Sequence, residues 1–207
     1  MAAEFIQLHQ SNPDQRRIRQ IVAELENGQV IILPTDTVYA LVCTLDNRDG
    51  IDRICKLLGK KPGKANLSLL CRDLSDLSEY CRQIPNPVFK LMKHVLPGPF
   101  TFILNATNAV AKRFRSNKKT VGIRVPESEI VHAILSELNM PLVSSSIHSE
   151  DEILDYITDP EEIYQVWQHQ VSMVIDGGAG SNIASTVLDC TENEAVIIRE
   201  GMGMDRL

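Results

Sequence analysis

The sequence predicts an α/β protein built on a twisted, open and mixed β-sheet flanked by helices. Segments with helical periodicity alternate with short apolar runs typical of strands, an order that builds sheets covered by helices. The last three strand candidates, 171–175, 185–188 and 195–198, lie too close together for helical crossovers, so some neighbours must be antiparallel. With 207 residues, of which 43% are hydrophobic, the chain can bury a sizeable core as a single domain spanning residues 1–207.

Local patterns predict the individual elements. The first helix rests on four apolar residues at helical spacing: Ile18, Ile21, Val22 and Leu25. Asn12, followed by Pro13, is its expected N-cap, and Gly28 ends it before a strand at 29–33. Further helices are predicted at 51–58, 74–80, 88–95, 130–138 and 160–167, and further strands at 67–71, 100–104, 120–125 and 141–145.

Composition excludes several classes of protein. The five cysteines, an odd number, form no Cys-x-x-Cys pair and lie at no ligand spacing from a histidine, so we expect neither disulfides nor a metal site. Buried thiols in a reducing cytosol fit this pattern. The sequence has neither a leader-like start nor an apolar run near the ~20 residues of a membrane helix, so we expect a soluble, cytoplasmic protein.

Charge leaves nucleic-acid binding to local patches. The net charge of −6 argues against attraction of the whole surface to phosphate backbones. Lysines 56, 60 and 61 nevertheless gather near the end of the second predicted helix. Lysines at that end also serve simply as partners of the helix dipole, so both interpretations stay open.

The segment Pro34-Thr35-Asp36-Thr37-Val38-Tyr39, hereafter the strand-end motif, is the most informative stretch. It follows the buried apolar run 30–33 and opens into hydroxyls, a carboxylate and a phenol. Open α/β sheets bind ligands at the carboxyl ends of their strands. The motif therefore predicts a ligand site at this edge of the sheet.

Other polar groups occur at predicted strand ends. They are Thr101, Arg124, Ser144, Ser145, Ser146, Ser185, Thr186 and Arg199. Each alone is also typical of an ordinary turn, or of an arginine paired with a nearby carboxylate. The glycine-rich stretch 176–180 resembles a phosphate loop, but no helical pattern follows it, so we interpret it as a turn.

Taken in order, these blocks resemble the YrdC-like family of threonylcarbamoyl-AMP synthases. The matching blocks are 34–41, 97–101, 121–126, 141–144, 185–189 and 198–201, and the match runs from about residue 12 to the end of the chain. Residues 66–74 are most similar to the YciO branch. The resemblance implies a YrdC-like fold with a positively charged concave face that holds nucleotide or RNA, either tRNA or double-stranded RNA.

The resemblance also implies a chemistry. Synthases of this family condense L-threonine, bicarbonate and ATP into threonylcarbamoyl-adenylate, which feeds a modified adenosine in tRNA. By this resemblance Arg124 and Thr35 hold the amino acid, since a planar guanidinium suits a carboxylate. The expected nucleotide side comprises Lys56, Lys60, Thr101, Ser144, Ser146, Ser185, Thr186 and Arg199. Mg²⁺ is expected to accompany ATP.

Three departures from the synthase pattern leave the reaction open. Synthases have Lys-x-Arg-Pro where this chain has Gly59-Lys60-Lys61-Pro62, and Ser-x-Asn where it has Ser146-Ile147-His148. Leu70 stands where many synthases have histidine. We therefore consider a protein that binds nucleotide or RNA, a working synthase, and an enzyme that removes the threonylcarbamoyl group from tRNA. In an enzyme, Lys61 and His148 are the catalytic candidates, although His148 also fits an exposed loop residue.

Overall fold

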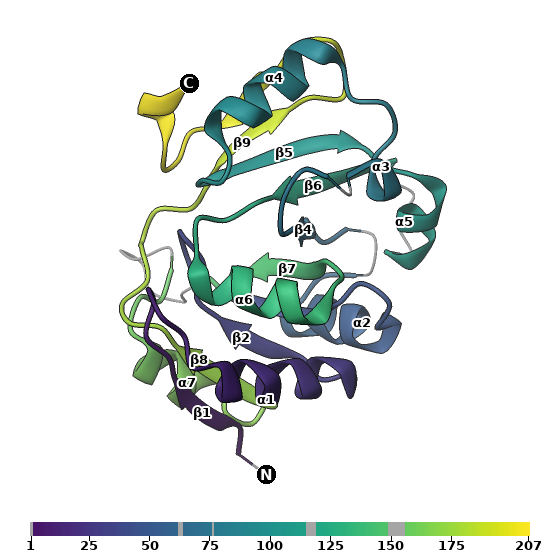
Figure 1. Ribbon diagram of the computed structural model, residues 1–207. Helices are drawn as coiled ribbons and strands as arrows, with labels where there is room; N and C mark the ends of the chain where they lie inside the picture. The colour runs from purple at the N-terminus through teal and green to yellow at the C-terminus, as the bar shows by residue number, and fades with distance from the viewer. Residues whose placement is uncertain (1, 62–63, 76, 115–118, 149–155) are drawn as a thin grey trace.

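A mixed sheet runs through the part of the chain that the computed structural model describes, residues 2–61, 64–75, 77–114, 119–148 and 156–207. Its ten strands follow the order β1-β8-β2-β3-β7-β4-β6-β5-β9-β10 (Figure 1). Their bounds are β1 Glu4–Gln7, β2 Ile31–Leu33, β3 Ala40–Thr44, β4 Ser68–Leu70, β5 Phe100–Asn105, β6 Thr120–Arg124, β7 Leu142–Ser146, β8 Met173–Asp176, β9 Thr186–Asp189 and β10 Val196–Arg199. Parallel pairs such as β5–β9 stand beside antiparallel pairs such as β9–β10, which confirms the predicted mixed sheet.

The helices fill the connections between strands. They are α1 Gln15–Glu26, α2 Arg48–Leu57, α3 Leu77–Tyr80, α4 Asn86–Val95, α5 Asn108–Arg113, α6 Glu129–Leu138 and α7 Pro160–Trp167, with a short 3-10 helix at Met204–Arg206. The predicted cap of α1 was wrong. Asp14, not Asn12, is the N-cap, because its carboxylate accepts the backbone N–H groups of Arg16 at 2.7 Å and Arg17 at 3.2 Å.

Apolar side chains pack on both faces of the sheet. Ile31 packs in a cluster with residues of α1 and α6, whereas its neighbour Ile32 packs in a second cluster with residues of α2, α4 and α7. Successive strand residues point to opposite faces, so the two helix groups cover opposite faces. Figure 1 shows α1 and α6 together on one side of the sheet.

Some elements escaped sequence analysis. Strand β3 is buried at all five positions and pairs antiparallel with both β2 and β7, so it has no alternation of apolar and polar residues to reveal it. Its first two residues, Ala40 and Leu41, belong to the matching block 34–41, for which no second strand was predicted. The edge strand β1 and the short helix α5 were also missed. Both are too short to give a clear period.

The cysteines agree with the prediction of buried thiols. All five are free and buried. Burial raises the pKa of Cys43, Cys81 and Cys190 to about 12, so these thiols stay protonated near neutral pH. Among the described residues, no helix combines the length and the apolar character needed to cross a membrane.

Candidate ligand-binding pocket

A cavity of about 390 Å³ lies over the middle strands of the sheet. We call it the cationic pocket. Alternate residues of neighbouring strands form most of its floor: Ser68 of β4, Thr101 and Ile103 of β5, Thr120, Gly122 and Arg124 of β6, Ser144 and Ser146 of β7, and Val187 of β9. Ser145 of β7 also lines the pocket. Ser144 pairs across the sheet with Val42, which packs in the cluster of α1 and α6. The pocket therefore lies on the face that these two helices cover farther along.

Gly122 keeps the pocket floor compact. A Cβ atom at this position would lie 2.6 Å from the hydroxyl oxygen of Ser68 and 3.2 Å from the Cγ2 atom of Thr101. Any side chain would push these two neighbours apart. The glycine in the sequence Val-Gly-Ile-Arg thus allows β4 and β5 to bring their hydroxyls close to β6.

The lining is rich in cations and hydroxyls. Lys60, Arg124 and Arg199 line the pocket together with His148, and no aspartate or glutamate is among its described lining residues. Most of the other polar residues that line it are serines and threonines. Because nearby cations and hydroxyl donors favour negative charge, the pocket suits an anionic ligand.

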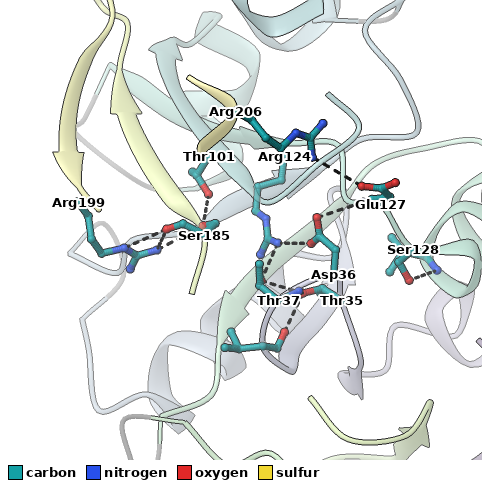
Figure 2. A network of polar contacts seen from close by, with 12 residues as sticks. Thr35, Asp36, Thr37, Thr101, Arg124, Glu127, Ser128, Ser185, Arg199 and Arg206 are labelled. Carbon is teal, nitrogen blue, oxygen red and sulfur yellow. Dashed lines mark hydrogen bonds and ion pairs between the residues drawn. The ribbon is translucent and has the colours of Figure 1, made fainter. Parts of the chain in front are cut away.

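Arg124 joins the pocket to the strand-end motif. Its Nη2 atom donates to the carboxylate of Asp36 at 2.7 Å and to the hydroxyl of Thr37 at 2.9 Å (Figure 2). The side chains of Arg124 and Asp36 are each only 6% exposed, so this is a buried ion pair. The second oxygen of Asp36 accepts the backbone N–H of Glu127. The Nε atom of Arg124 has no partner among the described residues.

Arg199 is held differently, at the opposite wall of the pocket. Its Nε and Nη2 atoms donate to the carbonyl oxygen of Ser185 at 3.2 and 2.8 Å, and Nη2 also reaches the Ser185 hydroxyl at 3.3 Å. That hydroxyl lies 2.8 Å from the hydroxyl of Thr101 (Figure 2). Arg199 is exposed, and no described carboxylate lies within ion-pairing distance of it.

The electrostatics of Arg124 reflect both arginines. Burial lowers the pKa of the Arg124 guanidinium, the charge of Asp36 opposes this shift, and the positive charge of Arg199 adds to it. An arginine nevertheless stays protonated near neutral pH. The pocket therefore carries two guanidinium charges that influence each other, of which only that of Arg124 has a carboxylate partner among the described residues.

Gly59 explains how Lys60 reaches the pocket. Gly59 has a φ of +64° just after α2, its N–H donates to the carbonyl of Lys56, and the N–H of Lys60 donates to the carbonyl of Cys55. This is the Schellman arrangement, in which a left-handed residue, most often glycine, ends a helix. Glycine here is thus a helix stop. After it the chain turns so that Lys60 lines the pocket.

The structure gathers eight of the predicted site residues in the cationic pocket. They are Lys60, Thr101, Arg124, Ser144, Ser146, His148, Ser185 and Arg199. Lys56, in the last turn of α2, and Lys61 do not line it.

Two predicted threonines are used by the fold itself. The Thr35 hydroxyl donates to the carbonyl of Val38 at 2.8 Å and accepts the N–H of Thr37, and Thr35 lies in a separate, open groove. Thr186 is fully buried, and its hydroxyl donates to the carbonyl of Met202 at 2.9 Å. Neither hydroxyl lines the cationic pocket.

Sequence reasoning missed several lining residues. Tyr156 lies beside His148, but no periodic pattern or motif surrounds it in the sequence. Ser68 and Thr120 belong to strands that were predicted correctly, and the alternation of strand side chains could have placed both on one face. Asp36 was noted as part of the motif and given no role.

The fold and the pocket thus define an α/β protein with a cation-lined pocket. A family model for the Sua5, YciO and YrdC proteins, described as "Telomere recombination", matches residues 23–201. The chain is 40% identical over 202 residues to the uncharacterized protein YciO of Escherichia coli K12, a match that covers 97% of each chain. It is 30% identical over 199 residues to the threonylcarbamoyl-AMP synthase of Homo sapiens, covering 91% of this chain and 68% of that protein. The chain belongs to the Sua5/YciO/YrdC family.

Solved structures agree with this assignment. The crystal structure of E. coli YciO matches with a TM-score of 0.88 and 39% identity over 97% of each chain. The crystal structure of P. abyssi Sua5 complexed with L-threonine matches with a TM-score of 0.85 and 24% identity, covering 95% of this chain and 57% of that one. The first match confirms the predicted likeness to the YciO branch. The second supports the shared fold.

Proposed function

We propose that the protein binds the phosphate-bearing part of a nucleotide, free or within an RNA, in the cationic pocket. The observation that carries the proposal is the charge of the lining, which has three cations and, among its described residues, no carboxylate. Cations and hydroxyls are the groups that bind phosphate oxygens. A pocket of this size also lies in the range of small-molecule sites.

The wall formed by Arg199 and Ser185 is the expected phosphate position. Arg199 is exposed, and the described residues engage its Nε and Nη2 atoms, so Nη1 can donate to a ligand. Its guanidinium is also fixed by two bonds to one carbonyl oxygen, which reduces the entropy lost when a ligand binds. Arg124, whose charge is already paired with Asp36, contributes less net attraction.

An RNA would extend beyond the pocket. Lys61 and Lys64 follow Lys60, and Lys119 precedes Thr120, so further cations neighbour two lining residues in the sequence. Each phosphate that a protein neutralises releases counterions, which makes the affinity fall as salt rises. We expect the affinity for tRNA or double-stranded RNA to fall clearly as salt rises. The affinity for free ATP should fall less, because ATP makes fewer phosphate contacts.

The residues that line the pocket suit ATP better than they suit Mg²⁺. Mg²⁺ prefers oxygen ligands such as carboxylates, and the described lining of the cationic pocket offers none. The hydroxyls and cations fit the phosphates of ATP directly. Any Mg²⁺ would therefore arrive with the nucleotide, held by phosphate oxygens and water.

Calorimetric titration with ATP tests the binding function. We expect saturable binding by the wild-type chain and a loss of at least roughly tenfold for Arg199→Ala, because a charged hydrogen bond to phosphate contributes about 1.5–3 kcal/mol. Arg16→Ala, which removes an exposed arginine on α1, serves as the matched control and should bind as wild type does. Absent binding of both ATP and tRNA, or equal binding by Arg199→Ala, would rule the proposal out.

A second candidate function is chemistry on a threonylcarbamoyl group. The 30% identity to the human threonylcarbamoyl-AMP synthase, together with His148 in the same pocket as Arg199, favours it. Imidazole can act as a general acid or base near neutral pH. Two reactions remain open under this proposal, formation of threonylcarbamoyl-adenylate from L-threonine, bicarbonate and ATP, and removal of the group from modified tRNA.

Two assays separate these reactions. A synthase releases pyrophosphate in the presence of ATP, L-threonine and bicarbonate, and Arg124→Lys should weaken that release. An enzyme of removal uses water to cleave the bond between the threonylcarbamoyl carbonyl and N6 of adenosine. N6 takes up a proton, and the released carbamate breaks down to L-threonine and bicarbonate. His148→Ala should slow this loss, because His148 lines the pocket. If the wild-type chain gives neither product above a heat-denatured sample, the enzymatic candidate fails and the binding function can still stand.

A further inference from the structure

The imidazole of His148 rests on an aromatic ring that no motif had indicated. Its centroid lies 4.9 Å from that of Tyr156, and the two ring planes are inclined by 32°. Both residues line the cationic pocket, His148 as an exposed residue and Tyr156 as a buried one with 7% exposure. The distance is within the range of aromatic pairs that attract each other.

Tyr156 itself is firmly held. Its side chain packs in a small apolar cluster with Val38 and Ala184, and its backbone N–H donates to the side-chain oxygen of Asn182 at 3.2 Å. The cluster lies apart from the two larger cores of the sheet. Tyr156 is thus a buried ring with an anchored backbone, and His148 is the exposed partner of the pair.

The partners of Tyr156 belong to the two sides of the pocket. Val38 is part of the strand-end motif, and its carbonyl accepts the hydroxyl of Thr35 at 2.8 Å. Ala184 precedes Ser185, and its carbonyl accepts the N–H of Met202 at 2.8 Å. The ring of Tyr156 therefore packs between the motif and the start of the wall that holds Arg199.

We infer that Tyr156 is a positioning residue, whose ring holds the imidazole of His148 at the pocket so that it meets a bound nucleotide in one orientation. The inference rests on the proposed function for its link to the ligand. Each side-chain rotamer that is lost on binding costs conformational entropy, and a ring contact that favours one rotamer beforehand lowers that cost. The contact with the buried ring of Tyr156 is in place before a ligand binds and favours one orientation of the imidazole.

Three substitutions isolate the role of the ring. Tyr156→Leu removes the aromatic face, whereas Tyr156→Phe keeps the face and removes the hydroxyl. Tyr164→Leu is the matched control, because Tyr164 makes an aromatic pair with Phe5 at a similar 5.1 Å and does not line the pocket. Any general effect of losing one aromatic pair should occur in both leucine variants.

Proton NMR of the histidine rings tests the position of His148 without a ligand. The chain has five histidines, and the signals missing in His148→Ala identify those of His148. A stacked tyrosine shifts the imidazole protons by its ring current. We expect Tyr156→Leu to remove this shift, and Tyr156→Phe and Tyr164→Leu to retain it. Unchanged His148 signals in a folded Tyr156→Leu variant would overturn the inference.

ATP titration of the same variants tests the consequence for binding. We expect Tyr156→Leu and His148→Ala each to weaken ATP binding roughly threefold to tenfold, and the double variant to lose little more than either single variant, because both act through one group. Additive losses would overturn the positioning role. If wild-type protein binds neither ATP nor tRNA, the proposed function fails, and the NMR experiment still decides whether Tyr156 holds His148.

Discussion

Arg124 and Arg199 line the same pocket and have opposite surroundings. Arg124 is buried, and its charge is paired at 2.7 Å with the carboxylate of Asp36. Arg199 is exposed, and its bonds within the described residues go to the neutral carbonyl and hydroxyl of Ser185. The charge of Arg124 is therefore largely balanced by Asp36, and the charge of Arg199 stays available for a ligand.

This difference separates two uses of the same residue type. Transferring an ion from water into the protein interior is costly, and Asp36 and Thr37 offset that cost for Arg124 by accepting hydrogen bonds from its guanidinium. An exposed arginine pays no such cost and contributes little to stability. The comparison predicts that Arg124 matters first for stability and Arg199 first for binding.

The largest expected effect is the loss of stability in Arg124→Met. This variant leaves the carboxylate of Asp36 buried without its partner, which typically costs about 3–5 kcal/mol. Urea denaturation at neutral pH measures the free energy of unfolding. Arg199→Met should change it by less than about 1 kcal/mol, as for other exposed charges.

The double variant Asp36→Asn with Arg124→Met sharpens this test. Because it removes both buried charges, we expect it to be more stable than Arg124→Met alone, and the double-mutant cycle should give a clear coupling energy. If Arg124→Met and Arg199→Met destabilise the protein equally, the distinction between a structural and a ligand-facing arginine collapses.

The next effect concerns binding, in Asp36→Asn. The amide keeps an oxygen that can accept from Nη2 of Arg124 and removes the compensating charge, so the guanidinium charge of Arg124, although still buried, is no longer balanced by Asp36. An added unit charge at about 4 Å contributes about 1 kcal/mol even at the dielectric constant of water, roughly fivefold in Kd. We expect calorimetry to show tighter ATP binding at low salt.

A remote change of the same charge provides the control. Glu26→Gln, at an exposed position near the end of α1, raises the net charge equally but lies outside the pocket lining. It should leave the Kd for ATP nearly unchanged. If Asp36→Asn binds ATP no better than Glu26→Gln does, Asp36 does not set the charge that the pocket presents.

More of the fold than of the candidate site could be predicted from the sequence. Alternating patterns predicted most helices and strands, and the spacing of the last strands predicted the mixed sheet. The hydroxyl of Thr35 was expected to face a ligand, yet it bonds to Val38 within its own turn. Such a choice between a local partner and a ligand depends on the path of a few loop residues, which residue types alone do not determine. Asp36 went unassigned because its partner lies 88 positions away in the sequence.

The smallest expected effect is on ATP binding and distinguishes Lys60 from Lys61. Lys60 is the third cation of the pocket, beside Arg124 and Arg199. Lys60 lines the pocket after the glycine turn that ends α2, whereas Lys61 does not. Both are exposed, so neither should affect stability measurably. We expect Lys60→Ala to weaken ATP binding by about 0.5 kcal/mol, roughly twofold, and Lys61→Ala to leave the Kd unchanged.

The pair is its own control, since both variants lose one charge from adjoining positions. If Lys61→Ala weakened ATP binding as much as Lys60→Ala, the attraction for ATP would come from the overall charge of this loop. A position in the pocket lining would then not determine which lysine contributes to ATP binding.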